Sequence, residues 1–340
     1  MSSKTSMQSD ATDRLDRQIL HCLQLDPRAA YRRIADVVGM SEQTVARRHR
    51  RLTSAGIVRV VATAGPAQVD SSWMMRIQCR PSAVRAMAEV LADQDNVAWV
   101  SVVGGGSEVL CSLRLRHQDE SHQLLLQRLP RTAEVLGLSA HAILHIFVHG
   151  NADDWTGYDD LLSAEQRARL LGAAGSEDAA EPRSTAYRPE EIDRPLMTML
   201  AVDGRATVKD LATHCKSTEA RVSRRLEVLS RTDWLRFEVD IAMGMLGFHT
   251  TAVLWLIIDP SQLHAAGNAL AEHSQVAFVA AVSGTSNLMA SVVCHDPAEL
   301  YAYISSEIAS VPGVRQLEIS LIMHNVKHER SREHRNRLRE

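Results

Sequence analysis

The sequence predicts an α+β protein built as two tandem copies of one unit, in which three helices and a strand precede a βαββαβ segment. Two observations predict this duplication. A shift of 177 positions places "LDRQILHCLQLDPRA" over "IDRPLMTMLAVDGRA" without a gap. A shift of 179 positions then places "VAWVSVVGGGSEVL" over "VAFVAAVSGTSNLM". Self-similarity at a fixed distance is the sequence signature of a repeated architecture.

The composition is that of an ordinary globular protein. Apolar residues make up 45% of the 340 positions, charged residues make up 23%, and the formal net charge is only −3. Any basic surface for a polyanion must therefore be local. The five cysteines include no C-x-x-C pair, which argues against a disulfide framework or a structural zinc site and fits a reducing compartment. We expect no metal and no cofactor.

The sequence also predicts no targeting signal and no membrane span. The start, "MSSKTSMQSDAT", is polar and lacks the apolar core of a signal peptide. The one long uncharged stretch, residues 274–294, is broken by "SGTSN" and favours a β-hairpin. We therefore expect a cytoplasmic protein.

The first part of each copy predicts a winged helix-turn-helix, at residues 12–62 and 190–240. In the first copy Thr12 is placed to cap a helix, Gly39 to end the second helix in a left-handed conformation, and Ser41 to cap the third, "SEQTVARRHRRL". Gly56 precedes the strand "IVRVVA". The second copy is degenerate, because Lys216 and Asp233 replace Gly39 and Gly56, and we expect it to lose both candidate left-handed positions.

The second part of each copy, at residues 69–149 and 247–327, predicts a ferredoxin-like βαββαβ domain with helices on one sheet face. In the first copy the last expected helix is "DESHQLLLQRLP". Residues 150–189 form an acidic linker, in which "DDLLSAEQRARLL" predicts one short helix and the remainder a mobile segment.

The third helix of the first copy is the candidate DNA-reading element. Residues 41–52 hold four arginines and one glutamate, and the polar face can serve base edges and phosphates. A solvated arginine face is the simpler alternative. The candidate DNA-binding residues, with their second-copy counterparts, are Ser41, Gln43, Thr44, Arg47, Arg48, Arg51, Arg221, Arg224 and Arg225.

The two copies differ in charge at this part. Residues 13–60 carry ten Lys/Arg and five Asp/Glu, a balance of +5, whereas residues 190–237 carry nine and eight, a balance of +1. Because DNA affinity rises with each phosphate neutralised, we expect the first copy to bind DNA more strongly than the second copy. His49 replaces an apolar position and is expected to be a partly buried core histidine.

This arrangement resembles the feast/famine (Lrp/AsnC) transcriptional regulators of prokaryotes. The match is carried by "LDRQILHCLQLDPRAAYRRIADVVGMSEQTVARRHRRLTSAGIVR" and more weakly by the hairpin turn "GGGSEVL". The resemblance implies a double-stranded DNA operator, a small-molecule effector such as an amino acid, and pairing of βαββαβ domains through their sheets. It departs from typical members in carrying two copies in one chain.

The resemblance places the effector near the two hairpin turns. The candidate residues are Gly105, Ser107, Glu108, Gly284, Ser286 and Asn287. Tight turn geometry alone also explains glycines and serines at these positions. Glu108 is expected in an exposed turn, where it would hold a charged amine without contributing much to folding.

A second function stays open. Sirohaem decarboxylases share this domain pair, occur as fused two-copy chains and act on a tetrapyrrole. The spacing in "HAILHIFVH" puts His141, His145 and His149 on one strand face, and His145 aligns with His324. A polar sheet face at a domain interface is the simpler interpretation. A pure assembly module is a third reading.

The linker of about forty residues reaches far enough for the two copies to pair within one chain. We expect an intramolecular pseudo-dimer. Because the helix-turn-helix of the second copy is expected to bind DNA weakly, two chains would be needed for a palindromic operator. This predicts a homodimer.

Overall fold

The computed structural model describes part of the chain in detail. The described residues are 12–69, 71–115, 132–148, 155, 157–158, 161–172, 187–328, 331–334 and 336–339. None of the helices in these ranges is long and apolar enough to cross a membrane.

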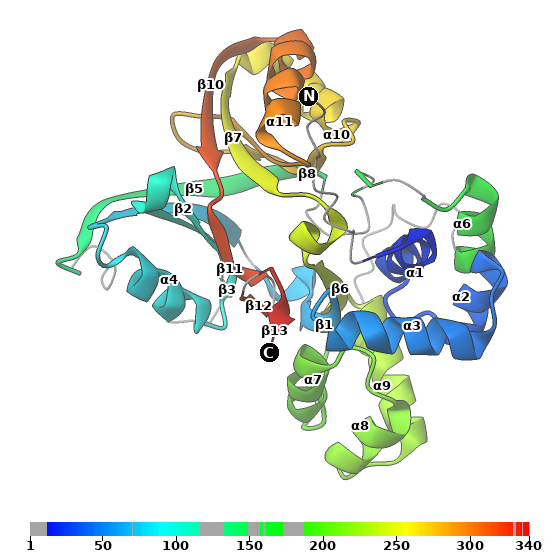
Figure 1. The fold of residues 1–340 in the computed structure, drawn as a ribbon. Helices are drawn as coiled ribbons and strands as arrows, with labels where there is room; N and C mark the ends of the chain where they lie inside the picture. Colours follow the sequence, from blue (N-terminus) through cyan, green and yellow to red (C-terminus); the bar gives the residue numbers. More distant parts are fainter. Residues whose placement is uncertain are drawn as a thin grey trace.

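Three helices and a strand form a compact unit near the N-terminus, here called the first head (Figure 1). Its elements are α1 (Arg14–Leu25), α2 (Tyr31–Val38), α3 (Glu42–Ser54) and β1 (Val58–Ala64). Gly39 adopts the expected left-handed conformation at φ 72°, and Ser41 caps α3 by accepting from the amide of Thr44. The cap of α1 is Asp13, which forms a capping box with Asp16, so the prediction of Thr12 was wrong by one residue.

The same order of elements recurs in the second head. Its elements are α7 (Asp193–Val202), α8 (Val208–His214), α9 (Glu219–Arg231) and β6 (Leu235–Ile241). Lys216 and Asp233 take the left-handed positions at φ 50° and 52°. The expectation that the second copy gives up these positions is therefore wrong. The backbone turns as in the first head, and non-glycine residues carry the strain.

Two four-stranded sheets follow the same topology and, within the described residues, belong to one continuous series of eleven paired strands. The first has the order β5-β2-β4-β3 and the second β10-β7-β9-β8. The first unit contains β2 (Ser71–Cys79), α4 (Val84–Ala92), β3 (Val97–Val103), β4 (Glu108–Leu115) and β5 (Val135–Val148). The second contains β7 (Thr250–Ile258), α10 (Leu263–Ala271), β8 (Val276–Val282), β9 (Leu288–Cys294), α11 (Pro297–Tyr303) and β10 (Val314–Leu321). The helix expected in "DESHQLLLQRLP" lies outside the described residues.

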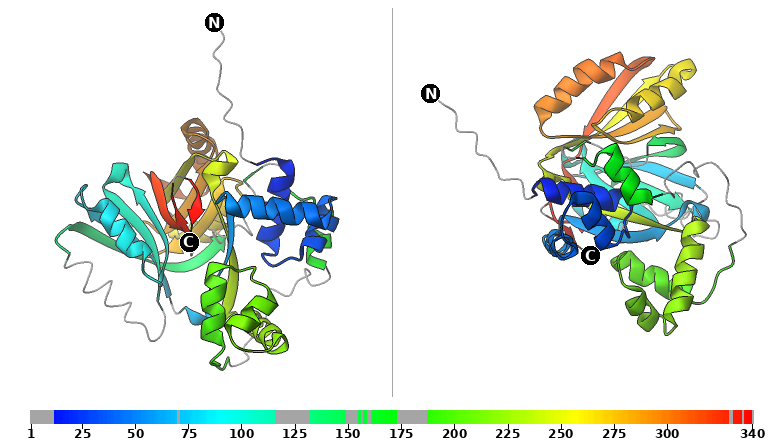
Figure 2. Two further views of the ribbon diagram at one scale, coloured as in Figure 1. Left: turned by 60° about the horizontal axis from the view of Figure 1, so that its bottom comes forward. Right: turned by 90° about the vertical axis from the view of Figure 1, so that its right-hand side faces the viewer.

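The two sheets pair within one chain, as expected. The second half of β5 leaves its own sheet and pairs with β8, and β11 (His324–His328), which follows β10, pairs with β3. Met74 and Leu110 of the first unit share an apolar cluster with Val253, Trp255 and Met289 of the second. The helices α4, α10 and α11 lie on the outer faces (Figures 1 and 2).

The linker contributes to the first head. The predicted short helix is α6 (Ala164–Leu171), capped by Ser163, and it packs on α1 and α2. Trp155 and Tyr158 join the apolar core of this head, where Trp155 meets Phe248 edge to face. Most of the segment expected to be mobile lies outside the described residues.

The last residues, outside both predicted copies, also contact the first head. They form β12 (Ser331–Glu333) and β13 (Leu338–Arg339). The amide of Leu338 donates to the carbonyl of Gly56 at 2.8 Å. The C-terminus therefore lies beside β1 (Figure 1).

Candidate nucleic-acid interface and effector site

One side of α3 is buried in the first head and the opposite side is exposed. Val45, His49 and Leu52 face the core. At the same helical spacing on the other side, Gln43, Arg47 and Arg50 are exposed. We call these three residues the reading face of α3. Within the described residues, the side chains of Gln43 and Arg47 form no hydrogen bond or ion pair, and Arg50 donates only to the Ala46 carbonyl of its own helix.

Arg50 was missed by the sequence analysis, although its spacing from Gln43 and Arg47 places it on their face. Thr44 and Ser41 are engaged with each other, because their hydroxyl groups lie 2.8 Å apart at the helix cap.

Arg48 does not lie on the reading face. Its Nη1 lies 2.8 Å from Oδ2 of Asp13 and 2.9 Å from Oδ1 of Asp16, and Arg51 also pairs with Asp16. Asp16 is 1% exposed. The predicted DNA-binding role of Arg48 is corrected on this ground: its guanidinium ties α3 to α1.

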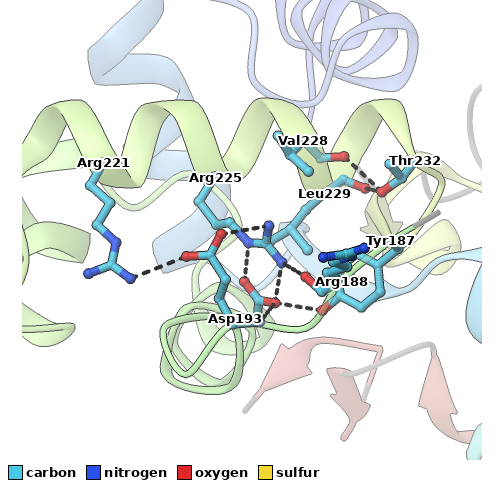
Figure 3. A network of polar contacts seen from close by, with 9 residues as sticks. Tyr187, Arg188, Asp193, Arg221, Arg225, Val228, Leu229 and Thr232 are labelled. Atoms are coloured by element: carbon cyan, nitrogen blue, oxygen red, sulfur yellow. Dashed lines mark hydrogen bonds and ion pairs between the residues drawn. The ribbon is translucent and has the colours of Figure 1, made fainter. Parts of the chain in front are cut away.

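Arg225 occupies the corresponding position in α9 and is buried more deeply. Its guanidinium pairs with both carboxylate oxygens of Asp193, with Glu190 at 3.1 Å and with the Arg188 carbonyl at 2.8 Å (Figure 3). It also lies over the ring of Tyr187. The hydrogen bonds that Arg225 donates to the carboxylate of Asp193 raise the pKa of Arg225. The prediction that Arg225 contacts DNA is wrong, because this pair is internal.

The exposed face of α9 differs from that of α3. The counterparts of Gln43, Arg47 and Arg50 are Ala220, Arg224 and Glu227, all of them exposed; these form the reading face of α9. Arg221, a predicted DNA contact, pairs with Glu190 at 3.2 Å. Arg224 forms no hydrogen bond or ion pair to any described residue, so it remains available.

The first hairpin turn is exposed, but the acid beside it is not. Gly105 (φ 66°) lies at the surface, and Ser107 closes the turn by donating to the Gly104 carbonyl at 2.8 Å. Glu108 begins β4, is 7% exposed and accepts from Nε of Arg76 at 2.8 Å. The expectation of an exposed Glu108 is therefore wrong, and its ion pair with Arg76 argues against a side chain that contributes little to folding.

Arg76 connects the two sheets around this carboxylate. Besides Glu108 it pairs with Glu318 of β10 at 2.5 Å, and its guanidinium lies 4.9 Å from the ring centre of Trp255 in β7. The carboxylate of Glu108 thus contributes to an ion-pair bridge between the sheets.

The second hairpin turn packs against β5. The Nδ1 of His141 lies 2.7 Å from the Ser283 carbonyl, and a Cβ on Gly284 would lie 2.6 Å from that nitrogen. The side chain of Asn287 bonds both the amide and the carbonyl of Ile258, each at 2.8 Å. Asn287 is thus committed to the backbone rather than to a ligand. Ser286 is half-buried.

The histidines of β5 do not share one face. Pairing with β8 is irregular between Ile143 and His145. The ring of His141 packs at a tilt against Trp255 between the sheets, whereas the ring centre of His145 lies 6.0 Å from that of His264 in the outer helix α10. His149 lies outside the described residues, which contain no group of three or more His, Cys, Asp or Glu side chains suited to a metal ion.

Comparisons with known proteins agree with this geometry. The AsnC-type helix-turn-helix domain matches residues 13–53, and the Lrp/AsnC ligand binding domain matches residues 251–332. An uncharacterized HTH-type transcriptional regulator of Pyrococcus furiosus is 30% identical over 120 residues, which are 34% of this chain and 81% of that protein. The chain belongs to the Lrp/AsnC family. The HTH-type transcriptional regulator Ptr1 of Methanocaldococcus jannaschii is 25% identical over 142 residues, 41% of this chain and 96% of Ptr1.

A solved structure resembles this Lrp/AsnC protein over nearly its whole length. The siroheme decarboxylase NirDL aligns with a TM-score of 0.59 and 13% identity over 92% of both chains, and its complex with an iron-uroporphyrin III analogue aligns with a TM-score of 0.58. At this identity the likeness concerns the fold alone. The two family matches cover the first head and the second βαββαβ unit, so the tandem duplication stays a prediction from the sequence.

Proposed function

We propose that this Lrp/AsnC transcriptional regulator binds a double-stranded DNA operator through the reading face of α3 and responds to a small molecule such as an amino acid. The observation that carries the proposal is the exposed row of Gln43, Arg47 and Arg50. On the other side of the helix, the Asp16–Arg48 pair and the buried Val45 and Leu52 fix its orientation. Such a row offers planar donors for guanine and an amide for adenine.

The test is selection of bound DNA from a random pool, followed by binding to the selected site across a salt series. Arg47→Ala is expected to weaken binding and to lower the salt slope by about one unit. The double variant Arg47→Ala/Arg50→Ala is expected to abolish selection. Arg85→Ala, which removes an exposed arginine of α4 outside both heads, is the matched control. Equal binding of the selected site by the double variant and the wild type would contradict the proposal.

The effector is proposed to bind at the exposed first turn, through the backbone of Gly105 and the hydroxyl of Ser107, and at the second turn through Gly284 and Ser286. The Ser107 hydroxyl donates to the Gly104 carbonyl, and its oxygen can still accept a hydrogen bond from a ligand. Glu108 and Asn287 are not proposed as ligand contacts, since both are committed to internal partners. Calorimetric titration with a pool of amino acids, on wild type and Ser107→Ala, tests this. Unchanged binding by Ser107→Ala would contradict the assignment of the first turn.

Assembly of several chains stays a prediction. A homodimer is expected because the second head, with a charge balance of +1, is predicted to bind DNA weakly, so that two chains would be needed on a palindromic operator. Light scattering of the free protein measures the assembly state directly. A DNA-bound regulator works where the DNA is, which agrees with the cytoplasmic location expected from the sequence.

A tetrapyrrole-processing enzyme is the second candidate, favoured by the fold likeness to NirDL over 92% of both chains. The histidine row offered for this activity is broken, because His145 points to α10 and His141 is bonded to the Ser283 carbonyl. Titration with an iron uroporphyrin distinguishes the candidates. A shifted visible band abolished by His141→Ala would favour the enzyme.

A further inference from the structure

The two heads are held in a fixed relation inside one chain. Strands β1 and β6 pair antiparallel, and Val61 lies opposite Glu238, its own counterpart at the 177-residue shift. A pseudo-two-fold axis therefore passes through this pair of residues. The two reading helices are related by that axis, as in a dimer built from separate chains.

A reciprocal pair of arginines strengthens this relation. Arg28 donates to the carbonyls of Gly204 and Ala206, and its counterpart Arg205 donates to the carbonyls of Pro27 and Ala29, at 2.6 and 2.7 Å. Each guanidinium also lies over an aromatic ring of the other head, because Arg28 covers Phe237 and Arg205 covers Tyr31. The heads are thus joined by directional contacts from both sides.

The reading faces that this axis relates are chemically unlike. The central position is arginine in both, as Arg47 and Arg224. The outer positions differ: Gln43 of α3 corresponds to Ala220 of α9, and the cation Arg50 corresponds to the anion Glu227. All of these positions are exposed.

The different side chains on the two reading faces favour different bases. Arginine donates to guanine and glutamine pairs with adenine, whereas alanine packs on the thymine methyl group and glutamate accepts from the cytosine amino group. A carboxylate also repels phosphate, which an arginine at the same position would bind.

We propose that one chain binds a non-palindromic operator with two unlike half-sites. Both half-sites contain the base pair read by Arg47 or Arg224. They differ where Gln43 and Arg50 select adenine and guanine, and where Ala220 and Glu227 select thymine and cytosine. This inference rests on the proposed function, and it assigns Arg50 and Glu227 as the residues that distinguish the half-sites.

The test is selection of DNA by the full chain and by Ala220→Gln/Glu227→Arg, which copies the α3 face onto α9. The wild type is expected to select unlike halves, and the variant a site closer to a palindrome. The reverse variant, Arg50→Glu, is expected to move the first half-site toward the second, with a loss of about tenfold on the wild-type site. Glu272→Arg, with the same charge change as Glu227→Arg but at the exposed C-cap of α10, is expected to leave the consensus unchanged.

The outcomes separate the two claims. A palindromic consensus for the wild type, a second half-site unchanged by Ala220→Gln/Glu227→Arg, or a first half-site unchanged by Arg50→Glu would overturn the inference and leave the proposed regulator function intact. Failure of the wild type to select any DNA would overturn the proposed function and the inference together.

Discussion

Arg225 and Asp193 form an internal ion pair between the reading helix α9 and the first helix of its head, and Arg48 and Asp16 form the same pair in the first head. The side chains of Arg225 and Asp193 are 8% and 7% exposed. Both arginines belong to the basic run that the sequence offers for DNA. In each run two arginines pair with acids of the same head, Arg48 and Arg51 in α3 and Arg221 and Arg225 in α9. Arg47 and Arg224 remain exposed.

Arg225→Ala is expected to destabilise the protein by about 3 kcal/mol, because it leaves the carboxylate of Asp193 buried without its partner. The neighbouring Arg224→Ala is expected to change stability by less than about 0.5 kcal/mol, since Arg224 is exposed. Urea denaturation of the full chain measures both. Equal effects of the two substitutions would show that the buried pair contributes little.

Arg47→Ala is expected to weaken operator binding more than Arg224→Ala does. The first head carries a balance of +5 against +1 in the second, so a contact in α3 is supported by more neighbouring cations. Fluorescence anisotropy at several salt concentrations gives both affinities. A larger loss for Arg224→Ala would reverse the assigned roles of the two heads.

Glu108→Gln is expected to lower stability by about 1–2 kcal/mol, because a buried charge-assisted bond to Arg76 is lost between the sheets. Glu318→Gln removes the other carboxylate on Arg76, which is 53% exposed, and is expected to cost less. Thermal denaturation compares the two. If Glu108→Gln melts at the same temperature as the wild type, the prediction from the sequence that Glu108 contributes little to folding would be right.

Acid is expected to loosen the first head before the second. Burial lowers the pKa of His21 and of His49 to about 4 from an ordinary 6.5. Each neutral imidazole therefore stabilises the fold above pH 6.5, and this contribution is lost as the pH falls toward 4. The counterparts in the second head are Thr198 and Leu226, which do not titrate.

Hydrogen exchange at pH 7 and pH 5 localises this effect. Protection is expected to fall in α1 and α3 and to persist in α7 and α9. His49→Leu, which copies the second head, is expected to shrink the change in α3. An equal loss of protection in both heads would exclude these histidines as its cause.

Lys216→Gly is expected to stabilise the second head by about 0.5–1 kcal/mol. Lys216 holds φ 50°, a conformation that costs a non-glycine residue about 1–2 kcal/mol, and the greater flexibility of glycine offsets part of the gain. Gly39→Lys in the first head is the converse control and is expected to destabilise. Denaturation midpoints measure both, and a destabilised Lys216→Gly would mean that the lysine side chain makes a stabilising contact.

Local patterns in the sequence predicted most of the fold. Caps, apolar spacing and glycine positions located the helices of both heads, and alternation located the strands. The sequence could not show which arginines form internal ion pairs and which stay exposed, because Arg47 and Arg48 are adjacent and of the same residue type. Only the packing of α3 on α1 places Asp13 and Asp16 against Arg48. Likewise the Arg76–Glu108 bridge joins strands, and spacing along one strand does not reveal it.

The reading face of α3 is the central claim, and selection of DNA from a random pool by the wild type and by Arg47→Ala/Arg50→Ala tests it most directly. We expect a defined, salt-sensitive consensus for the wild type and none for the variant, with the variant still folded by circular dichroism. A wild-type protein that enriches no sequence, or a folded variant that enriches the same one, would contradict it.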